Sequence, residues 1–146
     1  MAAIILDGNR IAAEIRSEVA SEVKGLTAAG IRPGLAVILV GHNPASEIYV
    51  RGKVKSSEEV GIYSEQLTPP DTISTEELLE LVLQLNRRDE IDGILVQLPL
   101  PAQVDSKRIL MAVDPGKDVD GFHPVNVGFL FSSQARVNDN EMWTQS

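Results

Sequence analysis

Three side chains that together suit proton transfer on a flat substrate occur at helical spacing in one short segment. Ser46, Tyr49 and Lys53 are separated by three and four residues, so a helix places them on one face. Tyr49 offers a ring for stacking, and a partly buried lysine beside a suitable neighbour can act as a general base. The ordinary alternatives are a packing tyrosine and a solvated helix lysine. Because Cys is absent and only two His occur, few other routes to catalysis are open.

Two further polar side chains follow later in the chain. Gln97 comes directly after the apolar residues 94–96, and its amide can both donate and accept, which suits it to orient an amine or a heterocycle. Its ordinary alternative is capping of a strand end. Asp120 precedes Gly121 in a loop, and its carboxylate can accept paired N–H donors from an aminopyrimidine-like edge. Asp-Gly is also a common turn pair, so a purely structural role stays open.

The remaining candidates fit loop roles better. Asp118 is expected to stabilise its turn or to form an ion pair with Lys117. His42 and His123 show no metal-ligand spacing and are interpreted as loop residues, so no metal site is expected. Gly41 precedes a helix start, which is a weak signal for anion binding. The sequence contains no Gly-x-Gly-x-x-Gly motif and no phosphate-binding P-loop.

Composition limits the class of protein. The chain has 146 residues, no Cys and a formal net charge of −8, so disulfides and thiolate metal sites are excluded and a nucleic-acid partner is not expected. The longest apolar run, 35–40, is much shorter than a membrane span, and the first residues lack the basic start of a signal peptide. These features favour one compact domain in the cytoplasm, without a membrane partner.

Segments of helical and strand-like pattern alternate along the chain. Short apolar runs predict strands over 35–40, 62–67 and 94–96. Apolar residues at spacings of three and four predict helices over 9–30, 44–60, 74–85 and 106–113. Capping signals support two of these helices: Asn43, Pro44 and Gly61 bound the second, and a capping box at Ser74 and Glu77 starts the third.

This alternation predicts an α/β fold of three layers, α/β/α, with a mostly parallel sheet. Ligands of such folds collect at the carboxyl ends of the strands. Residues 41–46 and 97–101 follow two of the predicted strands, and residues 117–121 follow the last helix. We therefore expect these three segments to line one cleft.

Three motifs in this order resemble the bifunctional methylenetetrahydrofolate dehydrogenase / methenyltetrahydrofolate cyclohydrolase family. The first is P-A-S-x-x-Y-V-x-x-K at 44–53, and the second is D-G-I-L-V-Q-L-P-L-P at 92–101. The third is K-D-V-D-G-F-H-P-x-N-x-G at 117–128. The resemblance extends from about Ile5 to Gly128. It implies the fold of the family's N-terminal catalytic domain.

The resemblance also implies an activity and roles for the candidate residues. Members of the family oxidise methylene-tetrahydrofolate with NADP, hydrolyse the methenyl product to formyl-tetrahydrofolate, and are typically homodimers. The essential amine corresponds to Lys53, the stacking ring to Tyr49 and the amide that orients the amine to Gln97. The carboxylate that anchors the pterin corresponds to Asp120. The other pocket-lining residues are Ser46, Leu98 and Pro99.

The resemblance further implies a domain organisation from which this sequence departs. The family carries a Rossmann domain for NADP and a returning helix downstream, whereas here a polar segment follows Gly128. We expect a folate-binding catalytic domain at 1–128, a loosely structured tail at 129–146 and no NADP-binding domain, as in a truncated chain. The apolar surface then left uncovered favours self-association. A non-catalytic folate-binding or interaction fragment, or a related amino-acid or shikimate-type dehydrogenase domain, remains an alternative.

Overall fold

A computed structural model describes residues 6–132 of the chain. Within this range three parallel strands form one sheet in the order β2-β1-β3. The strands are β1 (Gly34–Ile38), β2 (Tyr63–Leu67) and β3 (Gly93–Val96). β1 is central, with Ala36 opposite Glu65 on one side and Ile94 on the other.

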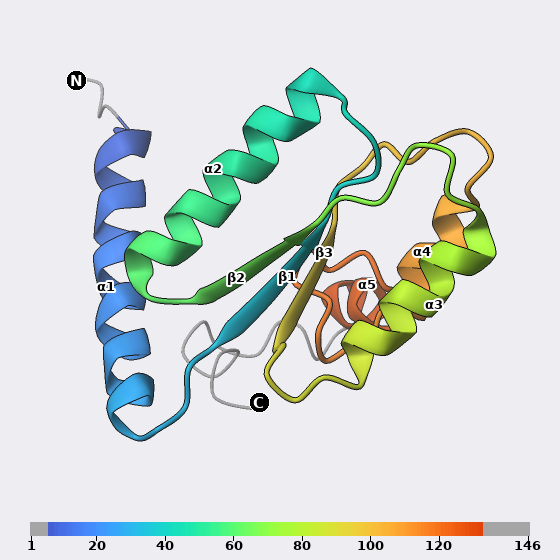
Figure 1. Ribbon diagram of the computed structural model, residues 1–146. Coiled ribbons are helices and arrows are strands. Elements are labelled where there is room, and N and C mark those ends of the chain that lie inside the picture. Colours follow the sequence, from blue (N-terminus) through green and yellow to red (C-terminus); the bar gives the residue numbers. More distant parts are fainter. Residues whose placement is uncertain (1–5, 133–146) are drawn as a thin grey trace.

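Helices cover both faces of this sheet, so the predicted three-layer α/β fold is confirmed (Figure 1). The helices are α1 (Gly8–Ala28), α2 (Pro44–Val60), α3 (Thr75–Asn86), α4 (Ser106–Ala112) and α5 (Pro124–Phe131). α2 packs on the sheet and α1 lies against α2, while α3 and α4 lie on the opposite face, with α5 beyond β3 (Figure 1). Within residues 6–132, none of the helices has the length and apolar character needed to cross a membrane.

The alternating residues of β1 divide the core into two clusters. Ala36 and Ile38 point into the larger cluster, which contains buried residues of α3 and α4. Val37 and Leu39 point into the smaller cluster, which contains the fully buried Val50 of α2. Val50 therefore anchors α2 to the sheet and fixes which face of that helix is left for the candidate residues.

Capping interactions set the limits of the helices much as the sequence predicts. The Asn43 side chain accepts a hydrogen bond from the backbone N–H of Ser46 at 3.1 Å, which starts α2. α2 ends at Gly61, whose φ of 93° lies in the left-handed region. The predicted capping box is also present, since the Oγ of Ser74 accepts from Glu77 N and the Glu77 carboxylate accepts from Ser74 N.

The observed elements differ from the prediction mainly at their ends. β1 ends at Ile38 rather than residue 40, although Leu39 N still donates to the carbonyl of Leu67 at 2.9 Å. The larger difference is α5 (Pro124–Phe131), because no helix was predicted over these residues. The expected domain limit at Gly128 therefore falls inside a helix, and residues 129–131 are not part of a loose tail. Residues 133–146 of that expected tail lie outside the described range.

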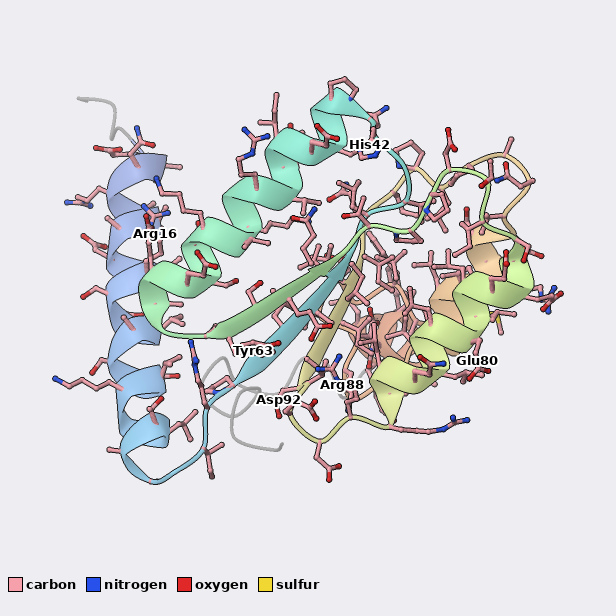
Figure 2. The ribbon with its side chains drawn as sticks, viewed as in Figure 1. Arg16, His42, Tyr63, Glu80, Arg88 and Asp92 are labelled. Atoms are coloured by element: carbon pink, nitrogen blue, oxygen red, sulfur yellow. The ribbon has the colours of Figure 1, made fainter. Side chains whose placement is uncertain are left out.

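An ion-pair network stabilises the amino end of the sheet. Arg88 donates to both carboxylate oxygens of Glu65, at 3.0 and 2.8 Å, and to Glu90 at 2.8 Å. These hydrogen bonds from Arg88 hold the pKa of Glu65 below its usual value. Asp92 accepts from the backbone N–H of Gly34 at 2.9 Å. Figure 2 shows Arg88 and Asp92 at this end of the sheet and His42 near the opposite end.

Candidate functional site

The candidate residues come from three segments that meet at the carboxyl end of the sheet. α2 follows β1, and residues 97–101 follow β3 directly. The third segment is attached to β3 as well, because the backbone N–H of Ile94 donates to Lys117 O at 2.7 Å and Ile94 pairs with Asp118 in an isolated parallel bridge. That attachment directs the chain toward the carboxyl end of β3, and Asp120 follows two residues later.

Lys53 and Gln97 are brought together at this end of the sheet. The Nζ of Lys53 lies 3.4 Å from the Oε1 of Gln97, and both side chains are half-buried. The Nε2 of Gln97 donates to the carbonyl of Leu98 at 2.8 Å. Because a carbonyl only accepts, this contact orients the amide so that Oε1 faces the amine. A backbone group thus fixes the amide, and the amide in turn holds the amine.

The Asp120 carboxyl is close enough to Lys53 to interact with it electrostatically. Partial burial raises the pKa of Asp120, the positive charge of Lys53 opposes that rise, and the negative charge of Asp118 adds to it. The amine of α2 and the amide at the end of β3 thus lie in contact, and the carboxylate of Asp120, on an exposed loop after α4, lies near enough to feel the charge of the amine. This set of groups can bind polar N–H edges and transfer a proton.

The other predicted pocket residues surround this group with different exposures. Ser46 is buried, with 5% of its surface exposed, whereas 68% of Tyr49 is exposed and its ring is free to stack on a ligand. Leu98 is half-buried and Pro99 is exposed, and the peptide bond between them is cis. Ser46, Lys53 and Tyr49, which were predicted to share one face of α2, therefore range from buried through half-buried to largely exposed.

Of the two roles expected for Asp118, stabilisation of its turn is the one observed. Its carboxylate accepts from the backbone N–H groups of Phe122 and His123, whereas Lys117 Nζ donates to the carbonyl of Arg88 at 2.8 Å. His123, interpreted as a loop residue, lies in the loop directly before α5 and is also the N-cap of that helix, with its Nδ1 accepting from Val125 N at 3.2 Å. Pro at position 124, in the first turn of the helix, is the sequence signal that predicts this start.

The turn between β1 and α2 does not provide a phosphate site. Gly41 has a φ of +70°, and a Cβ added there would lie 2.9 Å from the Cβ of Asp71, so the side chain of Asp71 fills the space above the turn. Glu47 adds a negative charge to the first turn of α2 and lies 3.1 Å from His42 Nδ1. Both features disfavour an anion, so the residues of this turn do not fit a dinucleotide cofactor. Among residues 6–132 no group of three or more His, Asp or Glu side chains is placed to hold a metal ion.

The fold is an α/β domain with the candidate side chains at the carboxyl end of a parallel sheet. Residues 6–120 match the family model described as "Tetrahydrofolate dehydrogenase/cyclohydrolase, catalytic domain". This match covers most of the chain, and the protein belongs to that family.

Individual relatives agree with this assignment. The chain is 73% identical over 130 residues to the bifunctional protein FolD of Koribacter versatilis and 67% identical over 129 residues to that of Solibacter usitatus. These matches cover 89% and 88% of this chain, respectively, but only 42% of each relative. The chain thus spans less than half the length of the curated relatives it matches.

Solved structures show the same fold. The bifunctional enzyme FolD from Campylobacter jejuni is 47% identical and superimposes with a TM-score of 0.87, covering 88% of this chain and 46% of that one. The Trypanosoma brucei enzyme, solved with NADP cofactor and an inhibitor, is 37% identical with a TM-score of 0.84, covering 88% and 44%. The predicted family resemblance is therefore confirmed.

Proposed function

We propose that this chain is a folate-binding catalytic domain of one-carbon metabolism that acts on methylene- and methenyl-tetrahydrofolate. The observation that carries the proposal is the contact of Lys53 with Gln97 beside Asp120, in a chain of the tetrahydrofolate dehydrogenase/cyclohydrolase family. The substrates follow from the family description and from the bifunctional relatives. The site residues fit them, because they supply one proton-transfer group and one acceptor for N–H donors.

Lys53 acts as the general acid and base in the hydrolytic reaction. The oxygen of a water molecule forms a bond with the methenyl carbon as one water proton passes to the amine of Lys53. The C–N bond then breaks as the leaving nitrogen takes up a proton and the new hydroxyl loses one, which leaves the formyl group and releases one proton overall. Gln97 holds the amine at the reacting carbon throughout, since the carbonyl of Leu98 fixes its orientation.

The remaining residues bind the folate. Asp120 accepts paired N–H donors from the aminopyrimidine edge of the pterin. Tyr49 stacks on the aminobenzoyl ring, and its largely exposed position leaves the ring available. The residues that line the rest of the pocket are Ser46, Leu98 and Pro99.

The oxidation of methylene-tetrahydrofolate requires a hydride acceptor, and NADP supplies that chemistry when it is bound. The Trypanosoma brucei relative contains NADP, but the residues of this chain around Gly41 do not fit a dinucleotide. We therefore assign the NADP site to the part of the relatives' length that this chain does not span. The folate-binding domain then comprises residues 1–128 together with the end of α5. We also place the protein in the cytoplasm.

Titration calorimetry of the 146-residue chain with 5-formyl-tetrahydrofolate tests the proposal. The wild-type chain is expected to bind, and Asp120→Asn is expected to abolish binding, whereas Asp89→Asn in an exposed turn serves as the matched control. A parallel assay of methenyl-tetrahydrofolate hydrolysis separates an enzyme from the binding fragment that remains the alternative. Binding without hydrolysis favours the fragment, and absence of binding by the wild-type chain refutes both.

A further inference from the structure

The carboxylate of Asp118 closes a turn that carries Asp120 at its tip. The Oδ2 of Asp118 accepts from His123 N at 2.8 Å and from Asn126 Nδ2 at 2.9 Å. Its Oδ1 accepts from Phe122 N at 3.3 Å. We call residues 118–123 the Asp118 turn. One side chain thus ties the start of this turn to its end and to the first turn of α5.

The Asp118 turn is fixed at the same time to the strand that ends in Gln97. Asp118 pairs with Ile94 of β3, and Ile94 N donates to Lys117 O at 2.7 Å. The side chain of Asn126 also donates to the carbonyl of Pro115 at 2.9 Å, which joins α5 to the segment before the turn. Asp118 therefore contacts β3, the rest of the turn and α5 at the same time.

The environment of Asp118 favours its ionised form, which accepts hydrogen bonds. Burial of its side chain would raise its pKa, but hydrogen bonds from Asn126 and from the backbone of the turn lower it below the usual value. Asp120, two residues away, has no such set of donors in the described structure, and its pKa is raised by burial. The two carboxylates of the motif thus have different environments: that of Asp118 accepts hydrogen bonds within the protein, whereas that of Asp120 accepts none among the described residues and lies within the electrostatic reach of Lys53.

We propose that Asp118, together with Asn126, is a positioning residue that holds the Asp120 carboxylate where it binds the pterin edge. This inference deepens the proposed function and rests on it. Asp118 does not touch the substrate in this scheme. It acts by keeping the turn closed, because a displacement of about 1 Å in a binding group can cost on the order of 100-fold in rate.

The test compares Asp118→Asn with Asp118→Ala. In Asp118→Asn the amide oxygen can accept on only one side of the former carboxylate, and the NH2 group faces a backbone N–H on the other side, so the affinity for 5-formyl-tetrahydrofolate is expected to fall about tenfold. Asp118→Ala removes the hydrogen bonds from Phe122 N, His123 N and Asn126 Nδ2 together. Its loss of affinity is therefore expected to be larger than that of Asp118→Asn. Asp89→Asn is the control for removal of one surface charge.

Nuclear magnetic resonance of the ligand-free chain supplies a second readout. The amide signals of Phe122 and His123 are expected to shift in Asp118→Asn and to shift further in Asp118→Ala, while those of residues distant from the turn stay in place. If Asp118→Asn does not fold, Asn126→Ala replaces it, since it removes the hydrogen bonds of Asn126 to Asp118 and to Pro115 but leaves the backbone contacts of Asp118, and it is expected to weaken binding by a smaller factor.

The outcomes separate this inference from the proposed function. If the wild-type chain binds no 5-formyl-tetrahydrofolate, the proposed function fails and the inference fails with it. If the wild-type chain binds and the folded Asp118→Asn variant binds equally well, only the inference is overturned. A folded Asp118→Ala variant that binds as tightly as Asp118→Asn also overturns it, because the loss of affinity must grow with the number of hydrogen bonds removed from the turn.

Discussion

The amine of Lys53 lies 3.4 Å from the Oε1 of Gln97, so a hydrogen bond joins the middle of α2 to the end of β3 across 44 residues of sequence. The Leu98 carbonyl fixes the amide from the other side at 2.8 Å. This chain of contacts gives Lys53 a defined position at the mouth of the sheet, which a solvated helix lysine would not have.

Replacement of Lys53 is expected to remove hydrolytic activity. Lys53→Met should lower the turnover of methenyl-tetrahydrofolate at least about 100-fold, because general acid–base catalysis contributes roughly 10²–10⁴-fold. Lys55→Met is the matched control, since Lys55 lies on the same helix, is exposed and pairs with Glu59 at 3.8 Å. The assay uses this chain or, if it does not turn over alone, a form extended to the length of its relatives. Undiminished turnover of Lys53→Met would remove that amine from the mechanism.

Replacement of Gln97 is expected to reduce kcat more than affinity. Gln97→Leu keeps the volume of the side chain but leaves Lys53 without its acceptor, so kcat should fall about 10- to 100-fold through misplacement of the amine. The KM for the folate should change little, because Asp120 and Tyr49 remain. Gln66→Leu on β2, where the amide contacts Thr68 at 3.1 Å, is the control. A loss confined to KM would contradict the positioning role of Gln97.

Folate affinity is expected to fall at acid pH through Asp120. Burial raises the pKa of this carboxyl above 3.8, so its protonation, and with it the loss of N–H acceptance, begins at a higher pH than for an ordinary aspartate. Because folding raises the pKa of Asp120, the ionised carboxylate disfavours folding at pH values above its folded-state pKa, and this penalty disappears as the pH falls. Asp120→Asn should therefore abolish binding at pH 7 without lowering the melting temperature. Calorimetric affinity as a function of pH, together with thermal unfolding, measures both effects.

The larger core cluster is expected to account for much of the stability. Leu78 of α3 is fully buried against the sheet, so Leu78→Ala should lower the free energy of unfolding by about 2–5 kcal/mol. Leu83→Ala on the same helix is the control, because Leu83 is exposed and such a change is usually within about 0.5 kcal/mol. Urea denaturation followed by circular dichroism gives both values. Equal losses in the free energy of unfolding at the two positions would contradict the burial of Leu78 in the core.

The surface of α5 is expected to promote self-association. Its residues Phe129, Leu130 and Phe131 are exposed, Phe131 by 82%, and no residue of this helix is buried. Light scattering should therefore show a mass that rises with protein concentration, and Leu130→Glu should shift that rise to higher concentration. A constant monomer mass over a wide range of dilution would exclude this behaviour.

The sequence predicts the elements that carry local signals. Asn43, Pro44 and Gly61 bound α2 as expected, and Ser74 starts α3 through its capping box, because these contacts involve residues within a few positions of one another. α5 was not predicted at all, although Pro124 is a start signal. Gly128 and the polar residues from Ser132 onward indicate a loose segment, yet the helix includes Gly128 and continues through the apolar residues 129–131.

The candidate site was predictable only in part. Helical spacing places Ser46, Tyr49 and Lys53 on one face of α2. It does not show that Ser46 is buried and Tyr49 exposed, because that depends on the packing of Val50 against the sheet. The turn role of Asp118 was expected, but its individual partners, two backbone N–H groups and the side chain of Asn126, were not identified from the sequence. The family resemblance indicates which residues to compare, and the contacts show how Asp118 and Gln97 are held.

The strand order β2-β1-β3 has a consequence for how this protein assembles. Lys53 and Gln97 can meet only after β3 has docked against β1, and docking of β3 is also what brings in Asp118 through its bridge to Ile94. α2, β1 and β2 can pack together without β3, but the candidate site would then be absent, because Gln97 and Asp118 are both positioned by β3. A ligand that binds at this site would therefore stabilise the complete three-stranded sheet by mass action, and the docking of β3 with it.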